Sequence, residues 1–241
     1  MPRQPGSSLR REGYFWQAHR PLVCLAFTAP LLVLFQAATA RYGTSLLAHR
    51  DLERILRYFG ATAPYLPPLL VVTVLLVQHL VRKDKWEVSM LVLAAMAGEA
   101  LLWTLPLVVM NVLTARLLPQ VPLAAGVSGA FQDVAVAVGA GIYEEFIFRL
   151  VLISLVMLLF VDLLSLPRGT VAACAIIVAA CLFSLYHFPA GLPSGEFLWG
   201  QFLFRALAGV YLGAVFVFRG FGLAVGTHAF FNLFVVFARM F

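Results

Sequence analysis

Charged residues are scarce in this sequence. Only 12% of its 241 residues are Asp, Glu, Lys or Arg, whereas 62% are hydrophobic and the mean hydropathy is +0.95. A soluble domain carries about 25% charged residues, so the composition excludes a water-soluble globular protein. The hydrophobic residues also gather in long runs, and a helix needs ~20 such residues to cross a bilayer. The chain is therefore predicted to be a membrane protein.

Cysteines and long polar loops are scarce as well. Cys24, Cys174 and Cys181 all lie within apolar runs and form neither a CxxC pair nor a zinc-finger spacing, so we interpret them as small apolar packing residues. No loop between the apolar runs is long enough to fold separately. We therefore predict an all-α protein, a polytopic transmembrane helical bundle. A basic cytoplasmic N-terminal tail at 1–20 precedes one transmembrane domain at 21–241.

Seven apolar segments are candidate membrane spans: 21–40, 64–81, 88–112, 134–165, 170–188, 201–218 and 222–238. An eighth is the alternative at 119–133, where prolines and glycines interrupt an apolar stretch and indicate a broken or re-entrant element. The predicted count is therefore about 7–8 spans. Residues 46–59 place most of their apolar and basic side chains on different helical faces, which predicts an amphipathic helix at the membrane interface.

The formal net charge is +6, and in a membrane protein such a surplus serves orientation and contact with anionic lipids. Nucleic acid is not implied as a partner. More basic loop residues fall on the side of the N-terminus than on the other side, which favours a cytoplasmic N-terminus. We expect a multi-pass integral membrane protein in the plasma membrane of a prokaryote, although an endoplasmic reticulum location would give the same spans.

Ionisable residues inside the spans need an explanation, because each costs about 2.5–3.5 kcal/mol on insertion scales. Glu145 and Arg149 are four residues apart in the favourable acidic-before-basic order and can neutralise each other. Glu144 projects about 100° away from Glu145 and lacks a partner in its own helix. It must be protonated, bound by another helix, or exposed to trapped water. A general base fits this position, and a carboxylate that lines a transport path fits it equally.

Two other ionisable residues, Glu99 and Arg205, have no local partner in their spans. One interpretation pairs them across helices, which would give them a structural role.

Two further predicted helices carry polar pairs. Phe183 and His187 are four residues apart and share a helical face, and so do His228 and Asn232. Two hydrogen-bond donors directed at one point could hold an oxyanion. Each pair alone is also explained by hydrogen bonds between helices. Together with Glu144, however, three separate helices within 134–238 supply groups that suit hydrolysis.

In this order, the patterns EExxxR at 144–149, FxxxH at 183–187 and HxxxN at 228–232 resemble the three motifs of the CPBP family. That family, also called Abi or CAAX proteases, contains the type II CAAX prenyl-protein endopeptidases. The resemblance implies an intramembrane endopeptidase with a water-accessible cavity among its helices. Its substrate would be a membrane-anchored or lipidated protein or peptide, with CAAX-type processing, removal of a C-terminal sorting signal and peptide maturation left open.

The resemblance also implies roles for the motif residues. Glu144 and His187 would activate a water molecule, and His228 and Asn232 would stabilise the tetrahedral oxyanion. Glu145 and Arg149 match family positions too, and their shared helical face indicates a supporting role.

These residues could also bind a metal ion. Two histidines and a glutamate resemble a His₂Glu zinc set, and members of the family are often labelled metalloproteases. The HExxH motif of many zinc peptidases is absent, and zinc would occupy the groups that the water and the oxyanion need. We therefore predict no metal and no other cofactor, with zinc as the disfavoured alternative.

Two competing interpretations come from other classes. The segment Gly126–Gly129 resembles the GxSG motif of rhomboid serine proteases, with Ser128 as nucleophile, but the HxxxN element precedes the serine in rhomboids and follows it here. The second is a non-enzymatic transporter, channel or scaffold in which the buried charges form interhelical ion pairs. An inactive family member that serves as a binding module belongs to this class.

Overall fold

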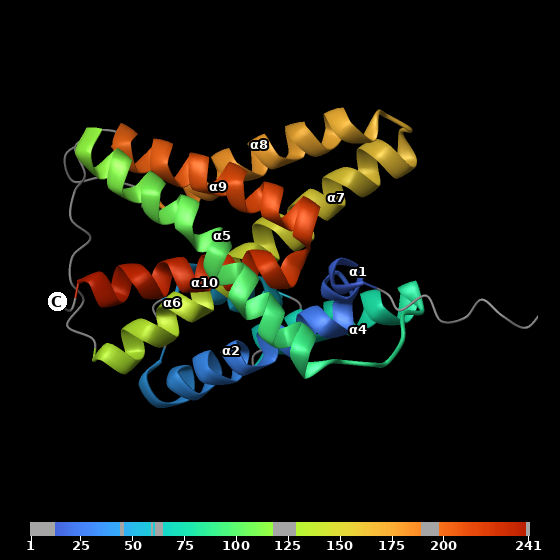
Figure 1. Ribbon diagram of the computed structural model, residues 1–241, viewed down its shortest axis with the longest axis horizontal. Helices are drawn as coiled ribbons and strands as arrows, with labels where there is room; N and C mark the ends of the chain where they lie inside the picture. The colour runs from blue at the N-terminus through green and yellow to red at the C-terminus, as the bar shows by residue number, and fades with distance from the viewer. Residues whose placement is uncertain are drawn as a thin grey trace, which may run out of the picture.

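The chain folds into a bundle of helices (Figure 1). The computed structural model describes residues 13–43, 46–58, 60, 65–117, 129–188 and 198–239. Its long helices are α2 (Pro21–Tyr42), α5 (Met90–Leu117), α8 (Arg168–Tyr186), α9 (Trp199–Arg219) and α10 (Phe221–Ala238). One further helical segment is continuous but divides into α6 (Ala130–Glu145), η1 (Phe146–Ile153), α7 (Ser154–Met157) and η2 (Leu158–Leu163). The elements η1 and η2 are π-helical.

The predicted all-α transmembrane bundle is confirmed. Within the described ranges, six helical segments are long and apolar enough to cross a membrane: α2, α5, the segment from α6 to η2, α8, α9 and α10. The remaining predicted segment, 64–81, forms α4 (Leu66–Arg82). This helix has 17 residues, which is at the short end of the range that spans a bilayer. Of the alternative eighth element at 119–133, residues 119–128 lie outside the described ranges, and α6 begins at Ala130.

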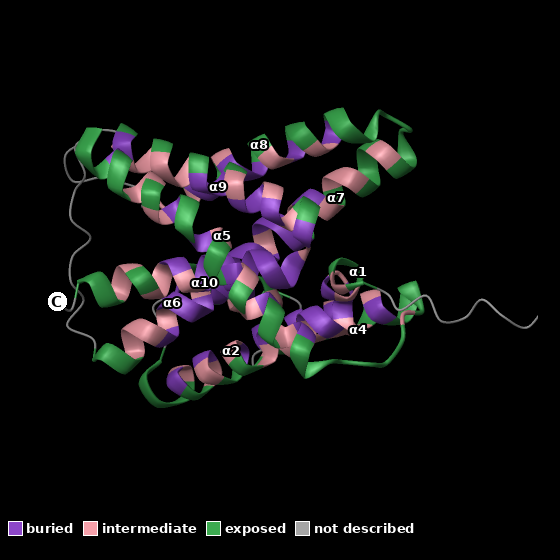
Figure 2. Ribbon diagram, viewed as in Figure 1, coloured by how far each residue is buried: buried purple, intermediate pink, exposed green. Residues whose placement is uncertain are grey.

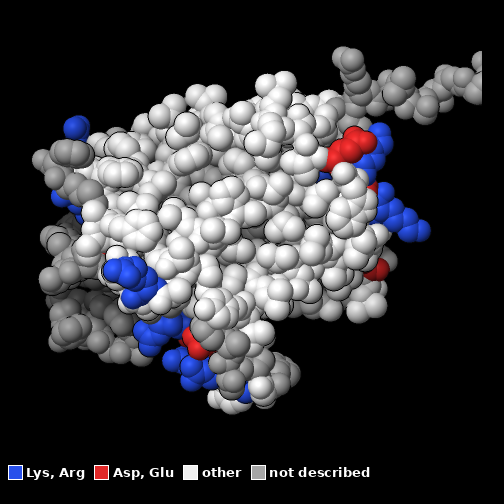
Figure 3. All heavy atoms as spheres, turned by 90° about the horizontal axis from the view of Figure 1, so that it is seen from below, with Lys and Arg blue, Asp and Glu red and all other residues white. Residues whose placement is uncertain are grey.

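The surface has the polarity of an integral, multi-pass membrane protein. Charged side chains on the face in Figure 3 gather near the two ends of the molecule, with a broad uncharged surface between them. Large hydrophobic side chains of α5 are also exposed, among them Leu101, Leu102, Leu105 and Val109, each more than half exposed. Such exposure is favourable when the surrounding solvent is hydrocarbon rather than water.

The predicted amphipathic helix is present as α3 (Leu47–Tyr58). It buries Ala48, His49 and Leu52 against the bundle, and leaves its arginines exposed. The hydroxyl of Tyr186, at the end of α8, donates a hydrogen bond to Asp51 at 2.5 Å. This contact ties α3 to the end of the bundle at which α8 ends. Its placement at the membrane interface stays a prediction.

Part of the predicted N-terminal tail forms a short helix, α1 (Tyr14–Ala18), while residues 1–12 lie outside the described ranges. The Tyr14 hydroxyl donates to Glu99 at 2.5 Å, and Arg219 donates to both oxygens of the same carboxylate at 2.5 and 2.7 Å. Burial and then the hydrogen bond to Glu99 raise the pKa of Tyr14, so its phenol keeps the donated proton. This cluster joins α1 to α5 and α9.

The proposed pairing of Glu99 with Arg205 is therefore wrong. Glu99 binds Arg219 at the C-terminal end of α9, whereas Arg205 lies about 21 Å away along the same helix at 1.5 Å per residue. Sequence alone offers several arginines as partners for one glutamate, and only the packing of α9 against α5 selects among them.

Helix α10 occupies the centre of the bundle, where it contacts α2, α5, α6 and α9. Its residues from Phe221 to Ala229 are all buried, and Figure 2 shows the buried residues gathered where these helices cross. The close approach of α6 needs a glycine: a Cβ at Gly141 would lie 2.8 Å from the backbone nitrogen of Ala229. Residue 229 directly follows His228, so this contact fixes the position of that histidine relative to α6.

We expect Gly141→Ala to destabilise the protein by about 1–3 kcal/mol, the usual cost of overpacking, because its methyl group would meet backbone atoms that cannot rotate away. Gly98→Ala is the matched control, since a Cβ at Gly98 has nothing within 4 Å. Alanine in that helix interior should be neutral or stabilising by up to about 1 kcal/mol. Thermal unfolding of the purified protein in detergent measures both. Equal unfolding temperatures for the two variants would contradict the close packing of α6 on α10.

Candidate active site

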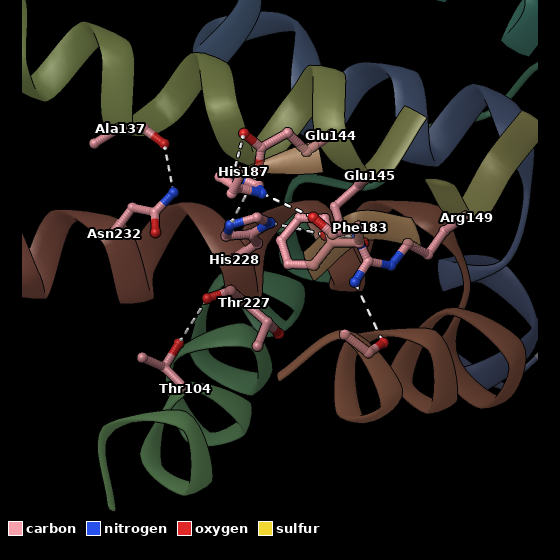
Figure 4. Close-up of polar contacts among 11 residues, drawn as sticks. Thr104, Ala137, Glu144, Glu145, Arg149, Phe183, His187, Thr227, His228 and Asn232 are labelled. Carbon is pink, nitrogen blue, oxygen red and sulfur yellow. Dashed lines mark hydrogen bonds and ion pairs between the residues drawn. The ribbon is translucent and has the colours of Figure 1, made fainter. Parts of the chain in front are cut away.

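Three helical segments bring the predicted polar residues together (Figure 4). Glu144 lies near the end of α6, His187 directly follows α8, and His228 lies in α10. One carboxylate oxygen of Glu144, Oε1, is 3.4 Å from Nε2 of His187, and the other, Oε2, is 3.7 Å from Nε2 of His228. The partner that Glu144 lacks in its own helix is thus a pair of imidazoles from two other helices.

The second nitrogen of each imidazole fixes its orientation. Nδ1 of His187 lies 2.8 Å from the backbone oxygen of Phe183, and because a carbonyl only accepts, Nδ1 carries the hydrogen. Nδ1 of His228 lies 2.8 Å from Oε1 of Glu145. That carboxylate is paired with an arginine and accepts as well, so this Nδ1 also donates. Both histidines therefore present Nε2 to Glu144.

Glu145 and Arg149 form the predicted ion pair inside the protein. Both residues are 0% exposed, and Nη1 of Arg149 lies 3.0 Å from Oε1 of Glu145. Arg149 also donates through Nη2 to the backbone oxygen of Gly209 in α9 at 3.3 Å. The contact of Glu145 with His228 could not be predicted from the sequence, because the two residues are 83 positions apart and no spacing rule relates them. Glu145 thus connects the buried arginine to an imidazole of the site.

A π-helical stretch, η1, begins directly after Glu145. In a π-helix each N–H bonds five residues back, and such stretches are rare and frequent at functional sites. The side chains after Glu145 therefore follow a different angular spacing from the 100° per residue of an α-helix. The predicted helical faces rest on the α-helical spacing. The π-helix η1 could not be predicted, because no residue type is specific to a π-helix.

Phe183 supplies the aromatic contact of the second motif. Its ring centroid lies 4.9 Å from that of His187 and 6.0 Å from that of His228. The guanidinium carbon of Arg149 lies 4.5 Å from the same ring centroid, a favourable cation–π distance. Phe183 therefore packs against both imidazoles and also against the supporting ion pair.

Asn232 lies one turn beyond His228 in α10, as its spacing predicts. Its Nδ2 donates to the backbone oxygen of Ala137 in α6 at 3.2 Å. An amide nitrogen carries two hydrogens, so this bond fixes the side chain and leaves one hydrogen for another acceptor.

The four predicted site residues line a common cavity of about 170 Å³ between α5, α6, α8, α9 and α10. A cavity of this size has room for several water molecules. The rest of its wall is mostly apolar, with one charged residue that the sequence analysis did not assign to the site; these residues are Leu107, Ala140, Phe183, Phe204, Arg205, Ala208, Leu212 and Phe231.

Two other predictions bear on the chemistry of the site. Ser128, the candidate rhomboid-like nucleophile, lies outside the described residues. Within the ranges that the structure describes, no group of three or more His, Cys, Asp or Glu side chains is arranged to hold a metal ion. The expectation of a metal-free site stays a prediction.

Comparison with known proteins finds one similar family. Residues 126–234 match the family model described as type II CAAX prenyl endopeptidase Rce1-like. Searches of curated proteins and of solved structures gave no match. The matched range contains all three motifs and every residue of the cavity wall except Leu107. Residues 126–234, slightly less than half of the chain, are therefore similar to the Rce1-like type II CAAX prenyl endopeptidases, a family of proteases.

Proposed function

We propose that the protein hydrolyses a peptide bond near the C-terminus of a lipidated or membrane-anchored substrate, with a prenylated CAAX protein as the first candidate. The observation that carries this proposal is the position of Glu144, a carboxylate flanked by two imidazole Nε2 atoms at the wall of a cavity inside a membrane bundle. Its location within the matched family range supports a protease rather than a transporter.

In the proposed mechanism, Glu144 is the general base. A water molecule in the cavity gives its proton to Glu144 while its oxygen attacks the scissile carbonyl carbon. His187 lies 3.4 Å from Glu144 and can orient the same water through Nε2. Glu144 then passes the proton to the nitrogen of the leaving amine, and the C–N bond breaks. Proton transfer by one positioned group in both steps is the usual pattern of general acid–base catalysis.

His228 and Asn232 would stabilise the negative charge that develops on the carbonyl oxygen. Nδ1 of His228 already donates to Glu145, so Nε2 can donate only when the ring is protonated. The Glu145 carboxylate holds the ring in place through Nδ1, as a carboxylate does when it orients a catalytic histidine. Asn232 adds its second amide hydrogen. Donors fixed before the reaction lower the barrier because they need no reorganisation.

We propose that hydrolysis is metal-free, because the imidazoles that a zinc ion would bind are the same groups that orient the water and the oxyanion. A chelator added to the purified active protein is therefore expected to leave the hydrolysis rate unchanged. Complete loss of cleavage that zinc alone restores would contradict the metal-free mechanism.

The substrate proposal is tested with a peptide that ends in S-farnesylcysteine, two aliphatic residues and methionine. The protein is reconstituted in lipid nanodiscs, and products are identified by mass spectrometry. We expect cleavage after the farnesylcysteine, with release of the C-terminal tripeptide, and much slower cleavage of the same peptide without the farnesyl group. Failure to cleave the farnesylated peptide, with cleavage of an unprenylated membrane-anchored peptide, would favour sorting-signal removal or peptide maturation.

A further inference from the structure

Among the described residues that line the cavity, Arg205 is the one arginine or lysine. It lies on α9, on the same helical face as Ala208 and Leu212, which also line the cavity. The other arginine near the site, Arg149, is held by Glu145. Arg205 therefore brings a charge into the cavity that the proposed hydrolysis does not use.

Among the described residues, this guanidinium has no fixed anionic partner. Its Nη1 atom is buried without a hydrogen-bond partner, and no salt bridge to Arg205 occurs in the part of the chain that the structure describes. Its ring contact is with Phe188, whose centroid lies 5.8 Å from the guanidinium carbon. Arginine stays charged in proteins, and leaving such a donor buried and unpaired is costly. A site that keeps it is suited to an anionic ligand.

We propose that Arg205 binds the C-terminal carboxylate of the peptide substrate. This inference rests on the proposed peptidase function and assigns a substrate-binding residue to it. The guanidinium presents parallel N–H donors that match the two oxygens of a carboxylate. In the proposed reaction, the fragment that carries this carboxylate is the one that leaves with a new amino group.

The neighbours of Arg205 define the rest of the ligand. The cavity walls around it are formed by apolar side chains of α5, α9 and α10, including Leu107, Phe204 and Phe231. These surfaces suit aliphatic residues next to the terminal carboxylate, and the cavity volume of about 170 Å³ restricts the deeply bound part to a short segment. The ligand class is thus a peptide with a free carboxylate and an apolar C-terminal residue.

The first test compares two forms of the farnesylated peptide, one with a free C-terminal carboxylate and one with a C-terminal amide. Wild type should cleave the carboxylate form with a kcat/KM about 10- to 100-fold higher, the range expected for a charge-assisted bidentate contact. Arg205→Gln should lower the value for the carboxylate form to that of the amide form and leave the amide value unchanged. Arg205→Lys should recover part of the difference, since it keeps the charge but loses the fork.

Arg116→Gln is the matched control, because Arg116 is exposed at the end of α5 and does not line the cavity. It should leave both values unchanged. An equal loss on both peptide forms in Arg205→Gln would overturn the proposal and assign Arg205 an electrostatic effect on Glu144.

The second test separates this proposal from the peptidase function. Binding of the tripeptide Val-Ile-Met, as the free acid and as the amide, is measured by calorimetry with wild type and with Arg205→Gln. The acid should bind wild type about 10- to 100-fold more tightly than the amide, and Arg205→Gln should abolish the difference. If no peptide is cleaved but this difference is found, the peptidase proposal fails and the carboxylate site stands. Equal binding of acid and amide to wild type, or no binding of either, would overturn the site.

Discussion

Glu144→Gln is expected to lower kcat/KM by about 100- to 10,000-fold, the range that a positioned general base contributes. The amide has nearly the shape of the carboxylate, so the side chain can keep its position between His187 and His228. It cannot accept a proton from water at neutral pH, and the first step of the proposed hydrolysis is lost. The measurement is the initial rate of farnesylated-peptide cleavage in nanodiscs. Uncleaved membrane proteins that accumulate with this variant in cells would identify natural substrates.

The matched control for this variant is Ser128→Ala, which removes the hydroxyl of the rhomboid-like alternative. We expect full cleavage by Ser128→Ala and an unfolding temperature for Glu144→Gln close to that of wild type. The opposite pattern, with cleavage retained by Glu144→Gln and lost in Ser128→Ala, would assign the reaction to the serine. A protein that transports a solute and cleaves no peptide would support the non-enzymatic alternative.

The spans could be predicted from the sequence because the signal is local. A run of apolar residues reports its own environment, and all seven predicted segments occur as helices within a few residues of their expected ends. No local sequence pattern indicates that α9 packs against α5. For this reason Glu99 was predicted to pair with Arg205, whereas it pairs with Arg219, although its need for a partner in the membrane was predicted correctly.

In the candidate site, too, contacts within one helix could be predicted from the sequence and contacts between helices could not. Residues one turn apart share a helical face, so the pairs Glu145 with Arg149 and His228 with Asn232 could be placed from spacing alone. The contact between Glu145 and His228 crosses 83 residues, and it depends on α6 and α10 meeting at Gly141. The role of Arg205 in the cavity wall was not predicted either, because an unpartnered arginine in a span has the same local sequence whether it faces a helix or a cavity.

The second large effect is expected from Arg149→Met. Glu145 and Arg149 are both 0% exposed, and removing one partner of a buried pair typically costs about 3–5 kcal/mol because the other charge stays buried. The chain offers a matched control in Glu53 and Arg57 of α3, which have the same four-residue spacing but are accessible to solvent, with side chains 22% and 62% exposed. Arg57→Met should cost less than about 1 kcal/mol. Chemical unfolding in mixed detergent micelles measures both, and equal costs would contradict a buried pair.

The double variant Glu145→Gln/Arg149→Met separates stability from chemistry. Removing both charges leaves neither member of this pair as an unpaired buried ion, so the stability of the double variant should lie closer to wild type than that of Arg149→Met. Hydrolysis should not recover with it, because Nδ1 of His228 then faces a neutral amide in place of a carboxylate. The His228 ring would then lose the carboxylate that orients it toward the oxyanion. Recovery of activity together with stability would show that Glu145 serves only to neutralise Arg149. Loss of activity at regained stability would identify Glu145 as the residue that positions His228.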